Sequence, residues 1–265
     1  MDFNLFSKNY EELFLQNIQK IFLNVKSYNQ DEYIDKEYTV FFPSCGTNDK
    51  SKIKFIFYGQ APNGWRTSFY FPDLIKNQNE MDLLLKKAIS SSNFASPMNW
   101  VNENWYPKEG AKEYAAYRSF FWNVVYKFIN CYNLGHSQVP NDEGEWFSND
   151  DWCNHLVWSN LMKLSPAEGG NPDGNEQNFQ MQFSKKLFAQ ELEEIQPAYA
   201  ILLTNWKWAK NFLDSSGFSI ETIENKDYLI AKGTFLKTKI IVTKRPFIGN
   251  AKKCINELLS LVSSF

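Results

Sequence analysis

Four short stretches of this sequence combine carboxamide side chains, bulky aromatic rings and basic groups, and each follows a segment that we expect to be a β-strand. They cover residues 59–65, 159–163, 204–208 and 244–250. The turn that ends a strand needs Gly, Asn or Asp, but it does not need Trp and Lys beside them. In open α/β sheets, ligands bind outside the carboxyl ends of the strands. We therefore predict that the four stretches line one ligand-binding cleft.

Alternating strands and helices predict the fold that positions these stretches. Short apolar runs predict the strands, and apolar residues three and four positions apart predict the helices. We expect strands at 53–58, 155–159, 198–203 and 238–243, helices near 8–26, 80–90, 113–131, 178–196 and 205–217 and after Asn250, and a hairpin-like pair at 218–236. This alternation is typical of a three-layer α/β/α fold with a mostly parallel central sheet.

The composition indicates one folded domain over residues 1–265, with an N-terminal helix at about 8–26. Hydrophobic residues make up 43% of the chain and charged residues 22%, which excludes disordered and fibrous proteins. No apolar run reaches the roughly 20 residues that a membrane helix needs. The first residues lack the basic and apolar regions of a signal peptide. We expect a cytoplasmic monomer without a membrane partner.

Cysteine and histidine are too scattered to predict a metal site. The two histidines, His136 and His155, are isolated, and no Cys-x-x-Cys pair occurs among Cys45, Cys131, Cys153 and Cys254. A structural zinc site needs about four such ligands at close spacing. We therefore expect free thiols, no metal and no cofactor.

The charge is unevenly distributed along the chain, although the net charge is only −2. Residues 200–265 hold 10 Lys and Arg against 5 Asp and Glu, whereas residues 1–199 hold 18 against 25. If the partner is a nucleic acid, the C-terminal part is the surface expected to meet its phosphates. The alternative is an ordinary solvated lysine face.

The residues of the strand-end stretches, and the order of the stretches along the chain, resemble the motifs of the uracil-DNA glycosylase superfamily, and most closely those of its Gly-Glu-Ala-Pro-Gly branch. Gly-Gln-Ala-Pro-Asn at 59–63 is similar to the first motif, and 157–163 is similar to a stretch that reads Thr-Asn-Val-Val-Lys in that branch. Arg245 and Pro246 stand where the second motif is expected to begin. The resemblance covers about 40–75 and 153–265. Residues 76–152 have no counterpart and are expected to be an insertion.

The resemblance implies roles for individual polar residues. Asn160 is expected to read the edge of a base, because its amide holds one donor and one acceptor in fixed geometry. Gln60 and Asn63 are expected to position a water molecule or line the ligand. Arg245 is expected to stabilise the departing base. For the three amides, the alternative is a turn residue at the end of a strand.

The same resemblance implies stacking surfaces and phosphate contacts. Trp65 and Phe71 offer flat rings for a base that has left its stack, although some aromatic residues of this segment belong to the core. Lys163 is expected to bind the substrate. Lys244 and Lys252 are expected to contact the nucleic-acid backbone, since charge neutralisation dominates such binding.

Several positions depart from the family pattern. Gln60 and Ala61 stand where members carry the carboxylate that activates water, and an amide cannot accept that proton as a base. Arg245 replaces the histidine of the second motif. Leu164 stands where an iron–sulfur cysteine would be, so no cluster is expected. Only Glu168 and Asp173 are obvious carboxylates near this edge.

Three hypotheses about function follow. The first is a nucleobase-recognising hydrolase that cleaves an N-glycosidic bond in nucleic acid, with DNA favoured over RNA. The second is a catalytically silent module that binds a nucleic acid or a free nucleobase or nucleotide. The third is a binder of another small metabolite, because a fold does not fix a function. A cleft that holds Gln60, Asn63 and Asn160 beside basic groups favours the first two.

Overall fold

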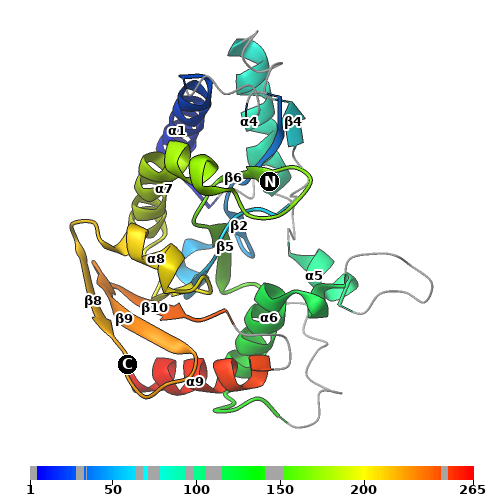
Figure 1. The fold of residues 1–265 in the computed structure, drawn as a ribbon. Helices are drawn as coiled ribbons and strands as arrows, with labels where there is room; N and C mark the ends of the chain where they lie inside the picture. Colours follow the sequence, from blue (N-terminus) through cyan, green and yellow to red (C-terminus); the bar gives the residue numbers. More distant parts are fainter. Residues whose placement is uncertain are drawn as a thin grey trace.

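Figure 1 shows the protein as a computed structural model. The structure describes residues 5–27, 33, 35–63, 68–70, 78–92, 98–105, 115–140, 152–245 and 250–265. Two of the predicted stacking residues, Trp65 and Phe71, lie outside these ranges. No helix within the described ranges is both long enough and apolar enough to span a membrane.

The central sheet has seven strands. Their order is β2 (Ser44–Cys45), β5 (Leu156–Asn160), β3 (Phe55–Gly59), β7 (Tyr199–Leu202), β10 (Thr238–Thr243), β9 (Leu229–Phe235) and β8 (Phe218–Thr222). Four neighbouring strands within the sheet, β5, β3, β7 and β10, are parallel. The predicted α/β class is confirmed, but the sheet is mixed rather than mostly parallel. Strands β2, β9 and β8 pair antiparallel at the two edges. The tight turn between β9 and β10 explains this in part, because so short a connection joins only antiparallel strands.

Helices cover both faces of this sheet. On one face lie α1 (Lys8–Ser27), α7 (Gly174–Ile195) and α8 (Trp206–Leu213), and on the other lie α6 (Phe120–Asn133) and α9 (Ala251–Ser264) (Figure 1). Side chains of β3 alternate between the faces, as a strand requires. Ile56 and Tyr58 join the core under α1 and α7, whereas Phe55 and Phe57 join the core under α6 and α9.

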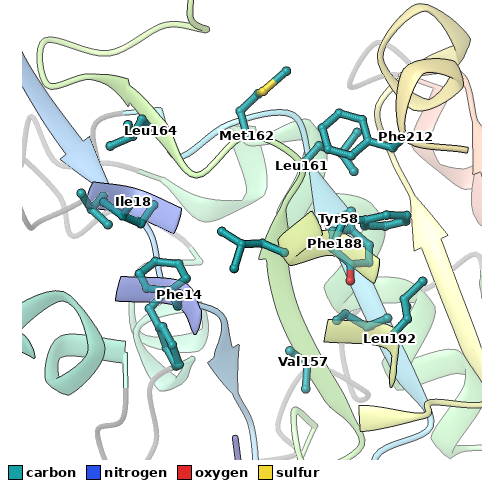
Figure 2. Close-up of a cluster of buried hydrophobic side chains, with 14 of the residues drawn as sticks. Phe14, Ile18, Tyr58, Val157, Leu161, Met162, Leu164, Phe188, Leu192 and Phe212 are labelled. Atoms are coloured by element: carbon teal, nitrogen blue, oxygen red, sulfur yellow. The ribbon is translucent and has the colours of Figure 1, made fainter. Parts of the chain in front are cut away.

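Figure 2 shows the core on the α1 and α7 face. Phe14 and Ile18 of α1 point toward the sheet, and Phe188 and Leu192 of α7 lie beside Tyr58. Phe188 and Tyr58 pack edge to face, with ring centroids 4.8 Å apart. This packing holds the strands that carry the predicted site residues.

A second, three-stranded sheet was not predicted from the sequence. Its middle strand β1 (Glu37–Val40) pairs antiparallel with β4 (Ser68–Tyr70) and with β6 (Leu164–Pro166). The sheet joins the chain on either side of the first predicted motif to the chain just after Asn160. It therefore brings two predicted stretches together from outside the main sheet.

The segment between β3 and β5 is part of the core. After β4, its described elements are α4 (Gln78–Ser92), α5 (Asn99–Glu103), the 3₁₀ turn η2 (Ala116–Arg118) and α6. Helix α6 packs against α9, and its Val124, Val125 and Phe128 are buried against the sheet. The predicted helix at 113–131 begins at Phe120, because Ser119 caps it by accepting a hydrogen bond from the N–H of Trp122.

Candidate functional site

A pocket of about 680 Å³ opens where the parallel strands end. Strand β3 lies between β5 and β7, so the chain leaves β3 toward one side of the sheet and later continues on the other side. Such a switch point is where open α/β sheets form their binding crevice. The described lining includes five amides (Gln60, Asn63, Asn104, Asn160, Asn171), five aromatic residues (Trp100, Phe120, Phe121, Trp122, Trp158) and one cation, Arg245.

Asn160 is the last residue of β5 and lies opposite Gly59 in the parallel pairing with β3. The residue is only 2% exposed, and its buried Nδ2 has no hydrogen-bond partner among the described residues. A Cβ on Gly59 would lie 2.4 Å from Asn160 Oδ1, so the glycine leaves room for this amide. Burying an amide donor without a partner is unfavourable, and a ligand acceptor in the pocket would relieve it.

Gln60 is held at both ends of its amide. Its Nε2 donates to the backbone oxygen of Thr204 at 2.8 Å, and its Oε1 accepts from Asn171 Nδ2 at 2.9 Å. Arg245 Nη1 also donates to this Oε1, at 3.3 Å. The residue is 9% exposed. Gln60 therefore ties the ends of β7 and β10 to the loop after β6.

Asn63 lines the pocket from a left-handed backbone conformation, with φ of 49°. Asn adopts this conformation more readily than most residues. Its Oδ1 accepts a hydrogen bond from the N–H of Gly170 at 2.6 Å. Asn63 thus joins the first predicted motif to the loop after β6.

Arg245 follows β10 and is exposed at the pocket. Its backbone N–H donates to Asn205 Oδ1, and its guanidinium lies 5.7 Å from the centre of the Phe120 ring. Within the described residues it has no carboxylate partner. Lys244 and Lys252 are also exposed, but neither is among the lining residues described above.

Lys163 does not lie in the pocket, contrary to its predicted role in substrate binding. Its side chain is 0% exposed and its Nζ forms an ion pair of 2.6 Å with the equally buried Glu191. The same Nζ donates to Ser159 Oγ and to the backbone oxygen of Asn160. Burial lowers the pKa of Lys163, and Glu191 opposes this effect. Bringing this ammonium to a ligand would leave the Glu191 carboxylate buried and unpaired.

Glu191 extends the buried network to the N-terminal helix. Tyr10 of α1 donates its hydroxyl to Glu191 Oε1 at 2.7 Å, and Ser159 donates to Oε2 at 2.8 Å. Burial, with the carboxylate beside it, raises the pKa of Tyr10 well above its ordinary value. The network fixes the backbone of Asn160 from the side of the sheet opposite the pocket.

The aromatic wall of the pocket was missed in the sequence, because the helix that carries Phe121 and Trp122 was interpreted as core alone. Trp122 packs edge to face with Trp158 of β5 at 4.7 Å and with Trp100 of α5 at 5.3 Å. Phe121 lies close to Gly59 and Asn160. The signal that could have revealed the wall is three successive rings, Phe120 to Trp122, which cannot all face one core.

No described carboxylate lines the pocket. Asp173 forms a capping box with Glu176 at the start of α7, and Glu168 lines a separate, smaller pocket beside Lys36 and Glu37. Within the described part of the chain, no group of three or more His, Cys, Asp and Glu side chains could hold a metal ion. The pocket can bind the face and the polar edges of a flat molecule, and Arg245, the cation of its described lining, favours a neutral or anionic ligand.

Compared with models of known protein families and with curated protein sequences, the chain matches none of them.

Proposed function

We propose that this chain is a uracil-DNA-glycosylase-like protein that recognises a nucleobase in DNA or in a free nucleotide, and that it binds the base better than it cleaves its glycosidic bond. The observation that carries the proposal is the Asn160 amide at the edge of the pocket, whose buried nitrogen has no hydrogen-bond partner in the described part of the chain. A base carbonyl is an acceptor that would satisfy this nitrogen.

The shape and chemistry of the pocket support a flat aromatic ligand. Rings from α5, α6 and β5 line it, and stacking against a base does not depend on the identity of that base. Gln60 and Asn160 lie at the sheet edge, where amides can form hydrogen bonds with the rim of a stacked ring. Selectivity among bases would then come from Asn160.

The absence of a described carboxylate in the pocket argues against efficient cleavage. Glycosidic bond cleavage passes through a positively charged sugar, which an acidic residue normally stabilises. Gln60 stands at the expected water position, but its amide is already bound at both ends and cannot take a proton. This observation favours the catalytically silent binding module as the second candidate function.

Titration of uracil-, hypoxanthine- and xanthine-containing single strands against the wild type and Asn160→Ala tests the proposal. Losing a bidentate base contact is expected to weaken binding of the preferred strand by about 1–3 kcal/mol. Asn133→Ala, near the far end of α6, is the matched control and should bind as the wild type does. Equal affinity of wild type and Asn160→Ala for every strand would contradict the proposal.

An assay for abasic sites on the same strands separates the two candidate functions. If the pocket is glycosylase-like, Gln60→Glu supplies the missing base and should raise cleavage on the order of 10²-fold or more. Its carboxylate oxygen would face the Thr204 carbonyl, so the melting temperature should fall. A folded Gln60→Glu protein that binds the strand and leaves it intact supports the binding module.

A further inference from the structure

Helix α6 begins at the pocket, and its first two backbone N–H groups have no hydrogen-bond acceptor among the described residues. Ser119, Phe120, Phe121 and Trp122 all line the pocket. The Ser119 side chain accepts from the N–H of Trp122, and its backbone oxygen accepts from the N–H of Asn123. The N–H groups of Phe120 and Phe121 form no hydrogen bond with a described residue. The start of a helix also carries a partial positive charge, which favours an anion.

Arg245 adds a full positive charge at the same place. Its guanidinium lies over the Phe120 ring, and Phe120 is the first residue of α6. The described lining holds no acidic residue that would neutralise this charge. Among the described residues, the guanidinium donates one hydrogen bond, to the neutral acceptor Gln60 Oε1, and its other N–H donors can reach a ligand.

The start of α6 spans the distance between Arg245 and the proposed base contact. Phe120 touches Arg245, whereas the next residue, Phe121, lies beside Gly59 and the Asn160 amide. The unpartnered, almost fully buried nitrogen of Asn160 is a second and independent sign of a ligand in this pocket. A volume of about 680 Å³ falls within the roughly 300–1,000 Å³ of pockets that hold a complete small molecule. A base at Asn160 therefore leaves room for a sugar and a phosphate.

We propose that the free N–H groups of Phe120 and Phe121, together with Arg245, bind the phosphate of a nucleotide whose base lies against Asn160. The ligand class is then a nucleoside phosphate, as a free monophosphate or as a unit of a strand. This inference rests on the proposed function for the position of the base. The phosphate site itself depends only on α6 and Arg245.

Calorimetric titrations with deoxyuridine and deoxyinosine, with their 3′- and 5′-monophosphates and with inorganic phosphate test the inference. One monophosphate should bind at least about tenfold more tightly than its nucleoside, the scale of one charge-assisted hydrogen bond. Arg245→Gln should remove this gain, so that the monophosphate and the nucleoside bind this variant with equal affinity. Arg118→Gln, which removes an exposed arginine outside the described pocket lining, should keep the gain.

A pair of variants at Phe120 isolates the backbone donor. Phe120→Ala removes the ring and keeps the N–H, whereas Phe120→Pro removes both. Proline is well tolerated as the first residue of a helix, and the extended backbone of Ser119 suits a residue that precedes proline. Phe120→Pro should bind the monophosphate more weakly than Phe120→Ala and bind the nucleoside equally well.

The outcomes separate this inference from the proposed function. Nucleoside binding that depends on Asn160, with no gain from either phosphate, would overturn the phosphate site and leave base recognition standing. Phosphate binding that depends on Arg245, without nucleoside binding, would support the site and overturn base recognition. No binding of any probe would overturn both. A uracil-containing strand that binds more tightly than the monophosphate would identify nucleic acid as the source of the phosphate, and equal affinity would identify the free nucleotide.

Discussion

Gly59 and Asn160 lie opposite each other in neighbouring parallel strands, and the missing side chain of one accommodates the amide of the other. Gly59→Ala would place a Cβ 2.4 Å from Asn160 Oδ1, where real side chains do not approach. We expect the amide to turn away, with base affinity lost to the extent expected for Asn160→Ala and a stability cost of about 1–3 kcal/mol. Strand titration and thermal unfolding measure the two effects.

Gly174→Ala is the matched control for this substitution. A Cβ there meets nothing within 4 Å, and the residue begins α7, where alanine is favourable. The control should bind the strand as the wild type does and unfold at the same temperature or slightly higher. Unchanged base affinity in Gly59→Ala would show that the position of the Asn160 amide does not matter for binding.

At the scale of the elements, the buried Lys163–Glu191 pair joins the end of β5 to α7, and Tyr10 joins both to α1. Lys163→Met or Glu191→Met alone should destabilise the protein by about 3–5 kcal/mol, because each leaves one charge buried without its partner. The double variant should recover most of this loss, since neither charge remains. Urea unfolding of the four proteins gives the coupling energy. Additive losses would show that the two groups act independently.

The contact between α7 and the start of the chain predicts a dependence of stability on pH. Glu194, in the last turn of α7, accepts hydrogen bonds from the N–H and hydroxyl of Ser7 and pairs with Lys50 at 2.9 Å. Burial alone would raise the pKa of Glu194, but Lys50 and Ser7 outweigh it and the pKa is lowered. As the pH falls, the Glu194 carboxylate is therefore protonated in the unfolded chain before it is protonated in the folded protein. The stabilisation that the contact provides is lost as the pH falls through the pKa of Glu194 in the folded protein.

Urea unfolding at a series of pH values between about pH 7 and pH 3 tests whether Glu194 makes the stability depend on pH. Glu194→Gln should lose less stability over that range than the wild type, by about 1 kcal/mol or less, because the pair is partly exposed. Glu193→Gln, its exposed neighbour, controls for the removal of a charge from α7. An identical pH profile in wild type and Glu194→Gln would show that the contact contributes nothing measurable.

The elements with strong periodicity were predictable from sequence, and those that depend on distant partners were not. The long helices α1 and α7 and the four parallel strands follow from apolar spacing, which reflects local geometry. The sheet of β1, β4 and β6 was missed because each strand has at most four residues and finds its partners far along the chain. The position of Asn160 at the sheet edge was predictable. The buried position of Lys163 was not, because spacing alone does not reveal a carboxylate on α7.

At the scale of the whole molecule, all four cysteines are buried (Cys45, Cys131, Cys153 and Cys254). Burial raises the pKa of Cys131 to about 11 and, with Glu257 nearby, that of Cys254 to about 12. Since the thiolate is the reactive form, the native protein should react with an aromatic disulfide reagent far more slowly than the unfolded protein, which should react at all four sites. Release of the coloured thiol measures both rates. Rapid labelling of one native thiol would reveal a local opening of the fold.

The two walls of the pocket come from separate parts of the chain. Gln60 and Asn160 lie at the sheet edge and Asn63 and Asn171 in the loops beside it, whereas Asn104 and four of the five described rings come from α5, α6 and the segment that joins them. In the proposed function, substitutions in that segment would raise or lower the affinity for all bases by a similar factor. Substitutions at Asn160 would instead change which base is preferred. Affinity and selectivity could then evolve independently, since the segment can change while the strands that read the base stay fixed.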